Sequence, residues 1–533
     1  MKKIKKRIEE GIKKVIEEIS NKVIDVDVFP SEKENFGDFT TNIVFKLGND
    51  YAEKIREKIL PIVSDIVEKI EIKNNYINFF VSKNVYFNFL KELVKAGKDV
   101  LKSEIGRGEN VLIEFVSANP TGPLTIAHGR QASFGEALSR IMKFANFSVV
   151  KEFYINDSGK QIDLLGESLK ARYYQLKGEE KYTIPEEGYH GEYLIQLAKE
   201  IKEEKVDDEF FKKFAYERIL EEIKRDLRNF GVEFDSWVNE SIFIKERKVD
   251  KIINELKEKG YIYFKDGSWW FKSSIFGDDK DRVIIKSDGT YTYLATDIAY
   301  HKYKIERNFS ILINIVGPDH HGYIPRMKAA VQAMGFEPEK LKFLIVQLTT
   351  LYKGKEKLSM STRKGEFISL KQLIDEVGPD ASKFFFLFRK VDSHLDFDIE
   401  LAKKQSTENP VFYLQYAYVR IKHILNFAES KNITIGKTEF DPDYLKEEEE
   451  LILLKKMWKF PDIIESVVKT YGVHLLCEYL LNLAKIFHSY YHKYRVVGED
   501  KKTTESRLFL IKGLYTIFSL SLDLLNISLL EEM

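Results

Sequence analysis

Apolar residues along this chain change their period twice, and the changes divide it into three regions. The first region begins with isoleucines four residues apart, which predicts an amphipathic helix; they are Ile4, Ile8, Ile12 and Ile16. Near residue 70, the stretch IEIKNNYINFFVS alternates apolar and polar positions on both sides of Asn74-Asn75, which predicts two strands joined by a turn. We therefore expect an N-terminal α+β add-on domain over residues 1–85, followed by a polar helical linker over 86–109.

The second region, residues 110–400, alternates apolar runs of strand length with helical segments. Four such runs are present: VLIEFV, VVKEFYIN, ILINIVG and LKFLIVQL. This alternation predicts an α/β fold built on a doubly wound, parallel, Rossmann-type sheet. Charged helical segments at about 160–280 interrupt the alternation and are expected to form an insertion. The third region, residues 401–533, is helical by period throughout, which predicts a C-terminal all-α helix bundle.

The composition indicates a folded protein of several domains. The 533 residues exceed what one hydrophobic core usually organises, and 44% of them are hydrophobic against 32% charged. No apolar run approaches the roughly 18 residues of a membrane span, so no membrane partner is expected. The formal net charge is zero, so a nucleic-acid partner would have to be held by local patches.

Cysteine usage and the first residues favour a cytoplasmic location. Cys477 is the only cysteine, which makes a disulfide within the chain impossible and a cysteine-based zinc site unexpected. Such usage is typical of a reducing compartment. The basic start of the chain is interleaved with glutamates, whereas a transit peptide is poor in acids. We therefore expect a cytoplasmic protein without zinc.

Two polar loops follow predicted strands of the sheet. SANPTGPLTIAHG comes after the first strand and GPDHHGY after the third. Ligands bind outside the carboxyl ends of parallel strands, so two histidine-bearing loops at that edge favour a binding site over two tight turns. The helix after Pro123 has free backbone N–H groups that suit a phosphate, and His128 could donate a hydrogen bond to it. The alternative is that His128 is a surface residue of the first helical turn.

Two further segments carry candidate chemistry. GKEKLSMSTRKGEFISL and the lysine that precedes it carry cations that could clamp a polyphosphate, although such a run is more often a solvated surface; they are Lys353, Lys355, Lys357, Arg363 and Lys364. In TYTYLATDIAYHKYK, Tyr293 and Asp297 are four residues apart and so lie on one helix face. A carboxylate beside a phenol suits a guanidinium or ammonium ligand. An exposed aspartate next to a core tyrosine is an equally good interpretation of this pair without its context.

In their order and spacing these segments resemble the arginyl-tRNA synthetases, a class I aminoacyl-tRNA synthetase family, over nearly the whole chain. EFVSANPTGPLTIAHGR is similar to the family's strand, loop and helix that end in a His-Val-Gly-His signature, and YINDSGKQIDLLG to its next strand and turn. Three more segments resemble its later catalytic motifs: FGDDKDRVIIKSDGTYTYLATDIAYH, GPDHHGYIPRMKAA and LSMSTRKGEFISLKQLIDEVG. FGDFTTN and YINFF resemble its N-terminal domain, and NPVFYLQYAYVRI its anticodon-binding helices.

The resemblance implies ligation of L-arginine to the 3′ end of an arginine-accepting tRNA through an arginyl-adenylate, with release of pyrophosphate and AMP. ATP with its Mg²⁺ would be bound, no resident metal is implied, and a monomer is expected. Catalytic roles at the phosphates fall to His128, Thr125, Ser361, Arg363 and Lys364. ATP contacts fall to Pro123, Ala127, Gly129, Gly317, Asp319, His320 and Met360, and arginine contacts to Glu114, Ser117, Asn119, Tyr293, Asp297 and His320. Tyr76 and Asn78 match positions used against the tRNA D-loop, and Tyr416 and Arg420 are candidates for stacking on anticodon bases.

The chain departs from the family pattern at two places. Thr125 and Ala127 stand where the signature has its first His and its Gly. Loss of one donor to a transition-state charge typically costs on the order of 100-fold in rate. Thr362 replaces the second Lys of the phosphate loop, and Arg363, Lys357 or Lys364 could substitute for it.

Three alternatives to an active arginine ligase remain from the sequence. A tRNA-binding paralogue without activation would explain Thr125 and Ala127, but it would not need to keep an amino-acid pocket. A ligase for another amino acid is disfavoured by Asp297 and by the D-loop type of N-terminal domain. A nucleotide-dependent oxidoreductase is the least favoured, because no Gly-x-Gly-x-x-Gly follows a strand.

Overall fold

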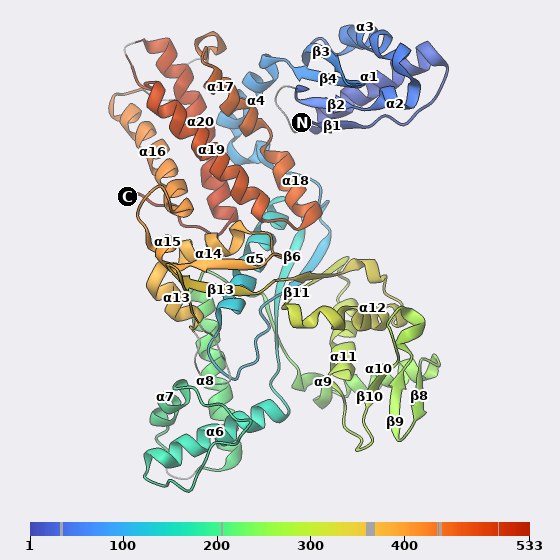
Figure 1. Ribbon diagram of the computed structural model, residues 1–533, viewed down its shortest axis with the longest axis vertical. Helices are drawn as coiled ribbons and strands as arrows, with labels where there is room; N and C mark the ends of the chain where they lie inside the picture. The colour runs from blue at the N-terminus through green and yellow to red at the C-terminus, as the bar shows by residue number, and fades with distance from the viewer. Residues whose placement is uncertain (32–35, 204–205, 359–367, 434, 436–439, 499) are drawn as a thin grey trace.

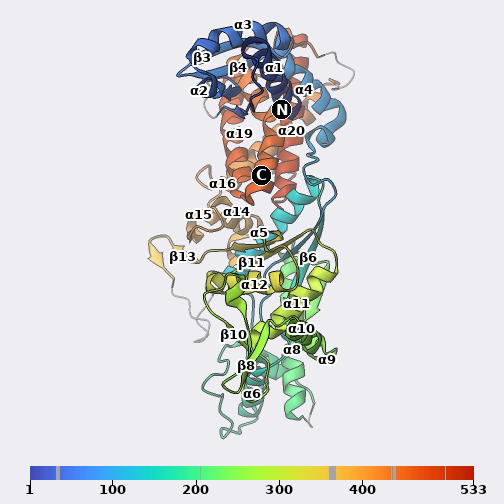
Figure 2. The same ribbon diagram turned by 90° about the vertical axis from the view of Figure 1, so that its right-hand side faces the viewer.

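Four parts follow one another along the molecule in the computed structural model: the N-terminal domain, the helix bundle, the parallel sheet with its covering helices, and helices α6–α8. The structure describes residues 1–533 except 32–35, 204–205, 359–367, 434, 436–439 and 499. In Figures 1 and 2 the N-terminal domain and helices α6–α8 lie at opposite ends, with the helix bundle and the parallel sheet between them. None of the described helices is long and apolar enough to cross a membrane.

The N-terminal domain packs helices on a four-stranded antiparallel sheet of order β1-β2-β4-β3. Its elements are α1 (Lys2–Ser20), β1 (Val28–Pro30), β2 (Phe39–Thr41), α2 (Ile43–Leu47), α3 (Ala52–Val63), β3 (Val67–Lys73) and β4 (Tyr76–Val81). The predicted amphipathic helix is confirmed as α1, which buries Ile8, Ile12 and Ile16 against α3. The predicted strand pair is confirmed as β3 and β4. Asn74 and Asn75 have φ of 52° and 63°, the left-handed pair that a two-residue type I′ hairpin requires.

Helix α4 (Lys83–Ala96) leads out of this domain and overlaps the range 86–109 that was expected to be a linker. It packs on the helix bundle, against α17 and α20, and buries Tyr86, Leu90 and Leu93. A Cβ on Gly513 of α20 would lie 2.7 Å from Leu90 Cδ1, so this glycine permits the close approach of the two helices.

A five-stranded, all-parallel sheet of order β12-β11-β5-β6-β7 forms the centre of the molecule and confirms the α/β fold class. Its strands are β5 (Asn110–Glu114), β6 (Ser148–Ile155), β7 (Ser236–Asn239), β11 (Ile311–Val316) and β12 (Leu341–Ile345). Alternate residues of β5 belong to different cores. Val111 and Ile113 face helix α5 (Ile126–Phe144), and Leu112 belongs to the core of α11 (Tyr293–Glu306) and α12 (Ile324–Ala333). The sheet is therefore covered on both faces, as a doubly wound fold requires.

The segments expected to form one insertion at about 160–280 form two excursions instead, because β7 of the central sheet lies between them, and the second excursion runs on to β10. The first contains α6 (Lys160–Leu176), α7 (Tyr193–Glu200) and α8 (Asp208–Asn229). The second contains α9 (Ser241–Lys245), α10 (Lys248–Glu258) and a three-stranded antiparallel sheet of β8 (Ile262–Lys265), β9 (Ser268–Phe271) and β10 (Arg282–Ile285).

The rest of the chain joins the parallel sheet to the helix bundle. A small sheet of β13 (Thr349–Lys353), β14 (Glu356–Lys357) and β15 (Leu395–Asp398) is accompanied by α13 (Leu370–Val377), α14 (Pro379–Phe388) and α15 (Ile399–Lys403). The predicted all-α bundle is confirmed as α16 (Pro410–Ser430), α17 (Glu448–Trp458), α18 (Phe460–Thr470), α19 (His474–Lys493) and α20 (Lys501–Leu524). Helix α14 contacts both α5 and the bundle helices α16 and α19.

Candidate active site

A cleft of about 860 Å³ lies at the carboxyl ends of β5 and β11, the neighbouring strands whose connections leave in different directions. Three of the four segments predicted to carry the chemistry meet there, namely those that contain Asn119, His320 and Asp297. The predicted residues that line it are Glu114, Ser117, Asn119, Ala127, His128, Tyr293, Asp297, Gly317, Asp319 and His320. Of the other predicted residues, Pro123, Thr125 and Gly129 do not line the cleft, and Met360, Ser361, Arg363 and Lys364 lie outside the described residues.

The loop after β5 holds its residues in an unusual backbone conformation. Val116 and Ser117 have φ of 68° and 39°, a region that β-branched residues rarely enter. The turn brings Ser117 back under the strand, where its hydroxyl donates to Glu114 Oε1 at 2.9 Å. Asn119 lies further out and donates from Nδ2 to Gln161 Oε1 of α6 at 2.7 Å.

His128 faces the cleft from the first turn of α5 as a neutral imidazole. Its Nδ1 accepts the backbone N–H of the N-cap residue Thr125 at 3.1 Å, in a capping box. Burial lowers the pKa of His128 to about 4. Because Nδ1 is an acceptor, the ring proton is assigned to Nε2, which leaves a donor for a ligand in the cleft.

The start of α5 is fixed to the segment that follows residues 359–367. The Leu370 backbone N–H donates to the Leu124 carbonyl at 2.7 Å, and Thr125 and Ser369 pair in an isolated antiparallel β-bridge. A Cβ on Gly129 would lie 2.5 Å from Leu370 Cδ1, so the absence of a side chain at Gly129 serves this close packing. The first turn of α5 and the start of α13 are therefore held together by backbone contacts.

A charged cluster lies beneath the cleft at Glu114. Its carboxylate accepts from Lys304 Nζ, which is fully buried and also donates to Asn314 Oδ1 at 2.9 Å. Burial raises the pKa of Glu114, but the Lys304 ammonium and the Ser117 hydroxyl outweigh burial, and the net shift is downward. Glu114 is thus held ionised next to the cleft.

Asp297 and Tyr293 line the cleft one helical turn apart on α11, as their spacing predicts. Burial and the negative charges of Glu240 and Glu114 raise the pKa of Asp297 to about 7, against a hydrogen bond from the Tyr323 hydroxyl that lowers it. Tyr293 is the first residue of the helix and is 64% exposed, at the rim. An acidic floor with an aromatic rim suits a flat organic cation.

The structure adds three residues that sequence reasoning missed. Glu240 is buried directly after β7 and raises the pKa of Asp297. Tyr323 donates its hydroxyl to Asp297 Oδ2. Tyr154 lines the cleft and stacks on Tyr300 at 4.2 Å, with a buried hydroxyl that has no hydrogen-bond partner in the described part of the chain. The rule that ligands bind at carboxyl ends of strands could have found Tyr154, which lies at the end of the predicted strand VVKEFYIN.

The remaining nucleotide candidates surround the short helix after β11. Gly317 caps that helix, and a Cβ there would lie 2.5 Å from Asp319 Oδ1. His320 is half exposed, with Nε2 3.6 Å from Asp319 Oδ2. These residues contribute small, polar surface to the cleft on the β11 side.

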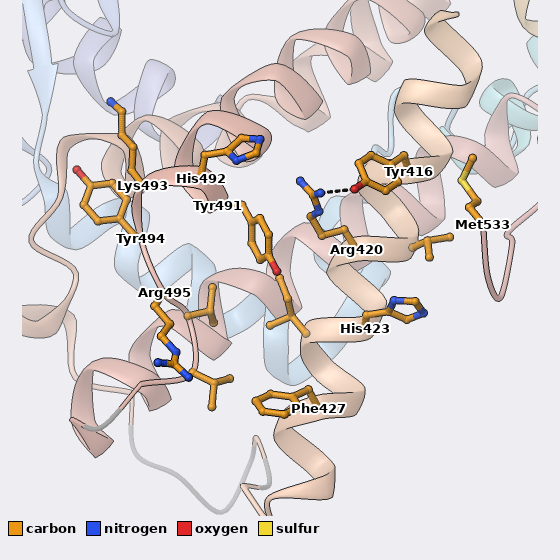
Figure 3. A pocket seen from close by; sticks show the side chains of 14 residues that line it. Tyr416, Arg420, His423, Phe427, Tyr491, His492, Lys493, Tyr494, Arg495 and Met533 are labelled. Atoms are coloured by element: carbon orange, nitrogen blue, oxygen red, sulfur yellow. Dashed lines mark hydrogen bonds between the residues drawn. The ribbon is translucent and has the colours of Figure 1, made fainter. Parts of the chain in front are cut away.

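Tyr416 and Arg420 lie far from the cleft in a second pocket of about 690 Å³ between α16 and α19, here called the bundle pocket. Figure 3 shows the Arg420 guanidinium between the side chains of Tyr416 and Tyr491. The guanidinium donates to the Tyr416 hydroxyl, and its central carbon lies 4.6 Å from the centre of the Tyr491 ring. Its other terminal nitrogen lies 3.2 Å from His488 Nδ1. The pocket is also lined by His423, Phe427, Lys493, Arg495 and Met533.

Tyr76 and Asn78 of β4 differ in exposure although both point to the same face of the N-terminal sheet. Tyr76 is 40% exposed and meets the 60% exposed Phe45 edge to face, with 5.4 Å between ring centres. Asn78 is buried, and its Oδ1 has no partner among the described residues. Tyr76 and Phe45 thus form an exposed aromatic pair above a buried amide.

Three protein families match successive parts of the chain. Residues 2–81 match "Arginyl tRNA synthetase N terminal domain", residues 90–385 match "tRNA synthetases class I (R), catalytic domain", and residues 414–533 match "DALR anticodon binding domain". The chain belongs to the arginine–tRNA ligase family. Membership removes the oxidoreductase and the other-amino-acid ligase from the alternatives.

Relatives in this family are similar over almost their whole length. The arginine–tRNA ligase of Syntrophotalea carbinolica is 42% identical over 522 residues, which cover 95% of this chain and 94% of that one. The Bacillus subtilis ligase is 40% identical over 522 residues, covering 95% and 93%. A solved structure of a putative arginyl-tRNA synthetase from Campylobacter jejuni has a TM-score of 0.78 at 34% identity, covering 85% of this chain and 100% of that one. The Thermus thermophilus arginyl-tRNA synthetase, at 21% identity and a TM-score of 0.79 over 99% and 100%, shows the shared fold.

The structure gives a local account of the departures from the arginine–tRNA ligase signature. Thr125 is the N-cap of α5, and threonine is a favourable residue for that position. Ala127 is exposed and lines the cleft, so its methyl group faces the space next to His128. His128 is the signature histidine that remains in the cleft.

Proposed function

We propose that the protein ligates L-arginine to the 3′ end of tRNA through an arginyl-adenylate, with ATP and its Mg²⁺ as substrate. The observation that carries this proposal is the position of Asp297. Its carboxyl group lies in one cleft with the N-terminus of α5 and His128. The site therefore offers an acid for a guanidinium next to donors for phosphates.

The amino acid is held through two acidic regions of the cleft. Asp297, with Glu240 behind it, accepts the guanidinium, and Tyr293 covers it from the rim. Glu114 and Asn119 take the α-amino end and orient the carboxylate. A guanidinium presents a planar fork of donors that pairs with a carboxylate in two bonds, which a lysine ammonium does not.

The chemistry requires alignment and charge stabilisation. The arginine carboxylate attacks the α-phosphate of ATP, a new O–P bond forms, and pyrophosphate leaves with the electrons of the broken bond. His128 donates from Nε2 to phosphate oxygens, and the free N–H groups of α5 face the same charge. A terminal ribose hydroxyl of tRNA then attacks the acyl carbon, and AMP leaves. Neither step needs a protein nucleophile.

The tRNA is held at two further surfaces. The bundle pocket offers aromatic faces beside Arg420, His423 and Lys493, a combination that stacks on unpaired bases and attracts phosphates. The exposed pair of Tyr76 and Phe45 provides a stacking surface on the N-terminal domain. We propose that the protein acts in the cytoplasm, where arginine, ATP and tRNA are available, and that it acts as a monomer, which light scattering of the purified protein tests.

Pyrophosphate exchange into ATP tests the proposed activity. With arginine, ATP, Mg²⁺ and arginine-accepting tRNA, we expect exchange, and only weak exchange without tRNA. Lysine serves as the control amino acid and should support none. Absence of exchange under every condition, together with retained tRNA binding, would establish the non-activating paralogue instead.

A further inference from the structure

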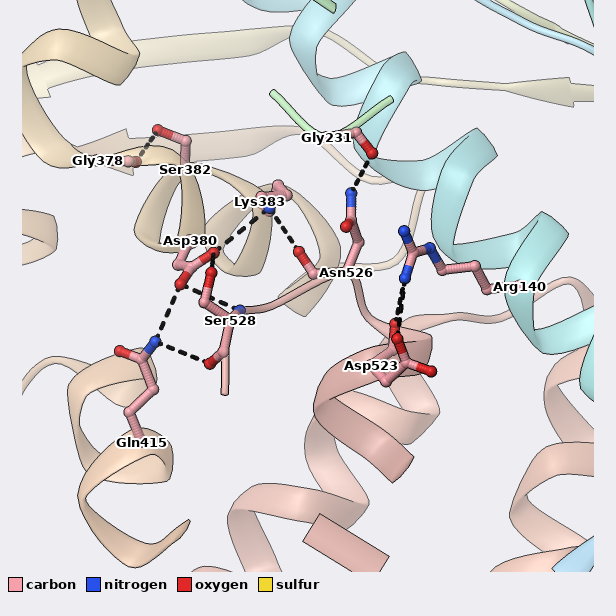
Figure 4. A network of polar contacts seen from close by, with 10 residues as sticks. All are labelled: Arg140, Gly231, Gly378, Asp380, Ser382, Lys383, Gln415, Asp523, Asn526 and Ser528. Carbon is pink, nitrogen blue, oxygen red and sulfur yellow. Dashed lines mark hydrogen bonds and ion pairs between the residues drawn. The ribbon is translucent and has the colours of Figure 1, made fainter. Parts of the chain in front are cut away.

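Asp380 joins the part of the chain containing the sheet to the helix bundle. It lies in the first turn of α14, and its carboxylate receives donors from two other segments, as Figure 4 shows. The Ser528 backbone N–H donates to Oδ2 and the Ser528 hydroxyl to Oδ1, each at 3.2 Å. Gln415 of α16 donates from Nε2 to Oδ2 at 3.1 Å.

The neighbouring Lys383 of α14 completes this junction. Its side chain is 7% exposed, and Nζ lies 3.4 Å from Asp380 Oδ1. Nζ also donates to the Asn526 carbonyl at 2.5 Å, and burial lowers the pKa of Lys383. Buried charges of this kind hold their partners firmly only while every member remains paired.

Ser528 and Asn526 belong to the last residues of the chain, 523–533, here called the tail. The tail contacts the part of the chain that contains the sheet at two more points. Arg140 of α5 donates to the Asp523 carbonyl at 3.0 Å, and Asn526 Nδ2 donates to the Gly231 carbonyl at 2.9 Å. Further along the tail, Met533 lines the bundle pocket. The tail therefore runs from contacts with α5 to the pocket.

Each side of Asp380 is close to a proposed substrate site. Gln415, its partner on α16, precedes Tyr416 of the bundle pocket. On the other side, α14 packs on α5, where Phe386 lies 3.2 Å from the position of a Cβ on Gly129, next to His128. A change in the angle at this junction would therefore change the distance between the bundle pocket and the cleft.

We propose that Asp380 is a positioning residue that sets the orientation of the helix bundle relative to the cleft, so that tRNA held in the bundle pocket presents its 3′ end to the adenylate. This inference rests on the proposed function. A folded tRNA is a stiff ligand that contacts both sites at once, and its second contact is productive only if the geometry of the two sites matches. A displacement of about 1 Å at a reacting centre can cost on the order of 100-fold in rate.

The Asp380→Asn variant tests the role, with Glu531→Gln as its matched control. Glu531 lies on the same tail and pairs with Lys422 of the bundle itself, so its substitution removes one negative charge without touching the junction. We expect the kcat of tRNA charging at saturating tRNA to fall at least tenfold in Asp380→Asn and to stay within twofold in Glu531→Gln. The Kd values for arginine and ATP should stay within twofold in both, because neither residue lines the cleft.

Further measurements separate positioning from damage. Ser528→Ala removes only the hydroxyl donor to Asp380, and we expect a smaller fall in kcat with an unchanged unfolding midpoint, which keeps the proposal testable if Asp380→Asn folds poorly. Normal kcat in both Asp380→Asn and Ser528→Ala would overturn the inference. So would a loss of arginine and ATP affinity that parallels the loss of kcat. If the wild-type protein does not charge tRNA with arginine at all, the proposed function itself fails. That result differs from the two outcomes above, in which the wild-type protein is active and only the role of Asp380 is refuted.

Discussion

The Tyr323 hydroxyl donates a hydrogen bond to Oδ2 of Asp297 at the floor of the cleft. The bond orients the carboxyl group and lowers its pKa, but burial and the charges of Glu240 and Glu114 act more strongly and leave the pKa at about 7. In the cleft without arginine, Asp297 therefore carries a proton part of the time at neutral pH. A guanidinium favours the ionised form, so arginine binding and proton release are linked.

Arginine affinity should therefore depend on pH. The Kd for arginine should be lowest above about pH 8 and rise up to about tenfold per pH unit below pH 7, because a larger fraction of Asp297 must lose its proton on binding. Titration calorimetry in buffers of different ionisation enthalpy measures the released proton directly. A Kd that stays constant from pH 5.5 to 8, with no proton release, would contradict this assignment of the carboxyl group.

Removal of the Asp297 carboxylate should abolish arginine recognition. In Asp297→Ala we expect KM for arginine to rise at least 100-fold, since a charge-assisted, two-bond contact is lost, while ATP binding persists. Tyr323→Phe keeps the carboxylate but removes its orienting bond and should raise KM less, by roughly fivefold. An unchanged KM for arginine in Asp297→Ala would refute the pocket.

His128 should contribute to the rate rather than to arginine binding. In His128→Ala the Nε2 donor is lost, and kcat for pyrophosphate exchange should fall on the order of 100-fold. KM for arginine should stay within about twofold. Because the pKa of His128 is about 4, its protonation should add no step to the pH–rate profile between pH 5.5 and 8. Full activity of the variant would show that other groups bind the phosphates.

Sequence periodicity predicted most of the parallel sheet because its strands are buried on both faces. The runs VLIEFV, VVKEFYIN, ILINIVG and LKFLIVQL became β5, β6, β11 and β12. The strand β7 was missed since it has four residues, SWVN, of which Val238 alone is buried. With β7 unseen, Glu240 after it had no strand end to mark it.

The unpredicted parts of the site depend on contacts between distant residues. Lys304 looks like a solvated residue of a helix, yet it is fully buried because Glu114, 190 residues earlier, neutralises it. The junction at Asp380 joins residues 148 positions apart, and such pairs leave no local pattern. Tyr293 and Asp297 could be found because both belong to one helix, where a spacing of four suffices.

tRNA affinity should fall steeply with salt. Binding of a polyanion releases counterions, so log Kd should rise linearly with log salt concentration with a slope of several units. Arg420→Ala should weaken tRNA binding. Lys257→Ala serves as the control, because Lys257 lies in α10 of the second excursion, away from the bundle pocket, and its ammonium contacts the Trp269 ring. Filter binding across a series of KCl concentrations measures the slope. A flat dependence would mean that the partner is not a nucleic acid.

Asp226 of α8 should limit the stability of the folded protein at neutral pH. It is 3% exposed, and its Oδ1 has no hydrogen-bond partner among the described residues. Burial and the neighbouring Glu222 raise the pKa of Asp226 to about 6. A raised pKa in the folded state means that ionisation opposes folding, so the free energy of unfolding should fall as pH rises from about 4 to 6 and then level off.

Asp226→Asn should therefore stabilise the protein by about 1 kcal/mol at pH 7.5. This value is smaller than the pKa shift alone would give, because solvent screens part of the charge. Urea unfolding at both pH values tests this, because the two proteins should unfold at nearly the same urea concentration at pH 4, where Asp226 is protonated. Equal midpoints at pH 7.5 would show that Asp226 is hydrated and ionised without cost.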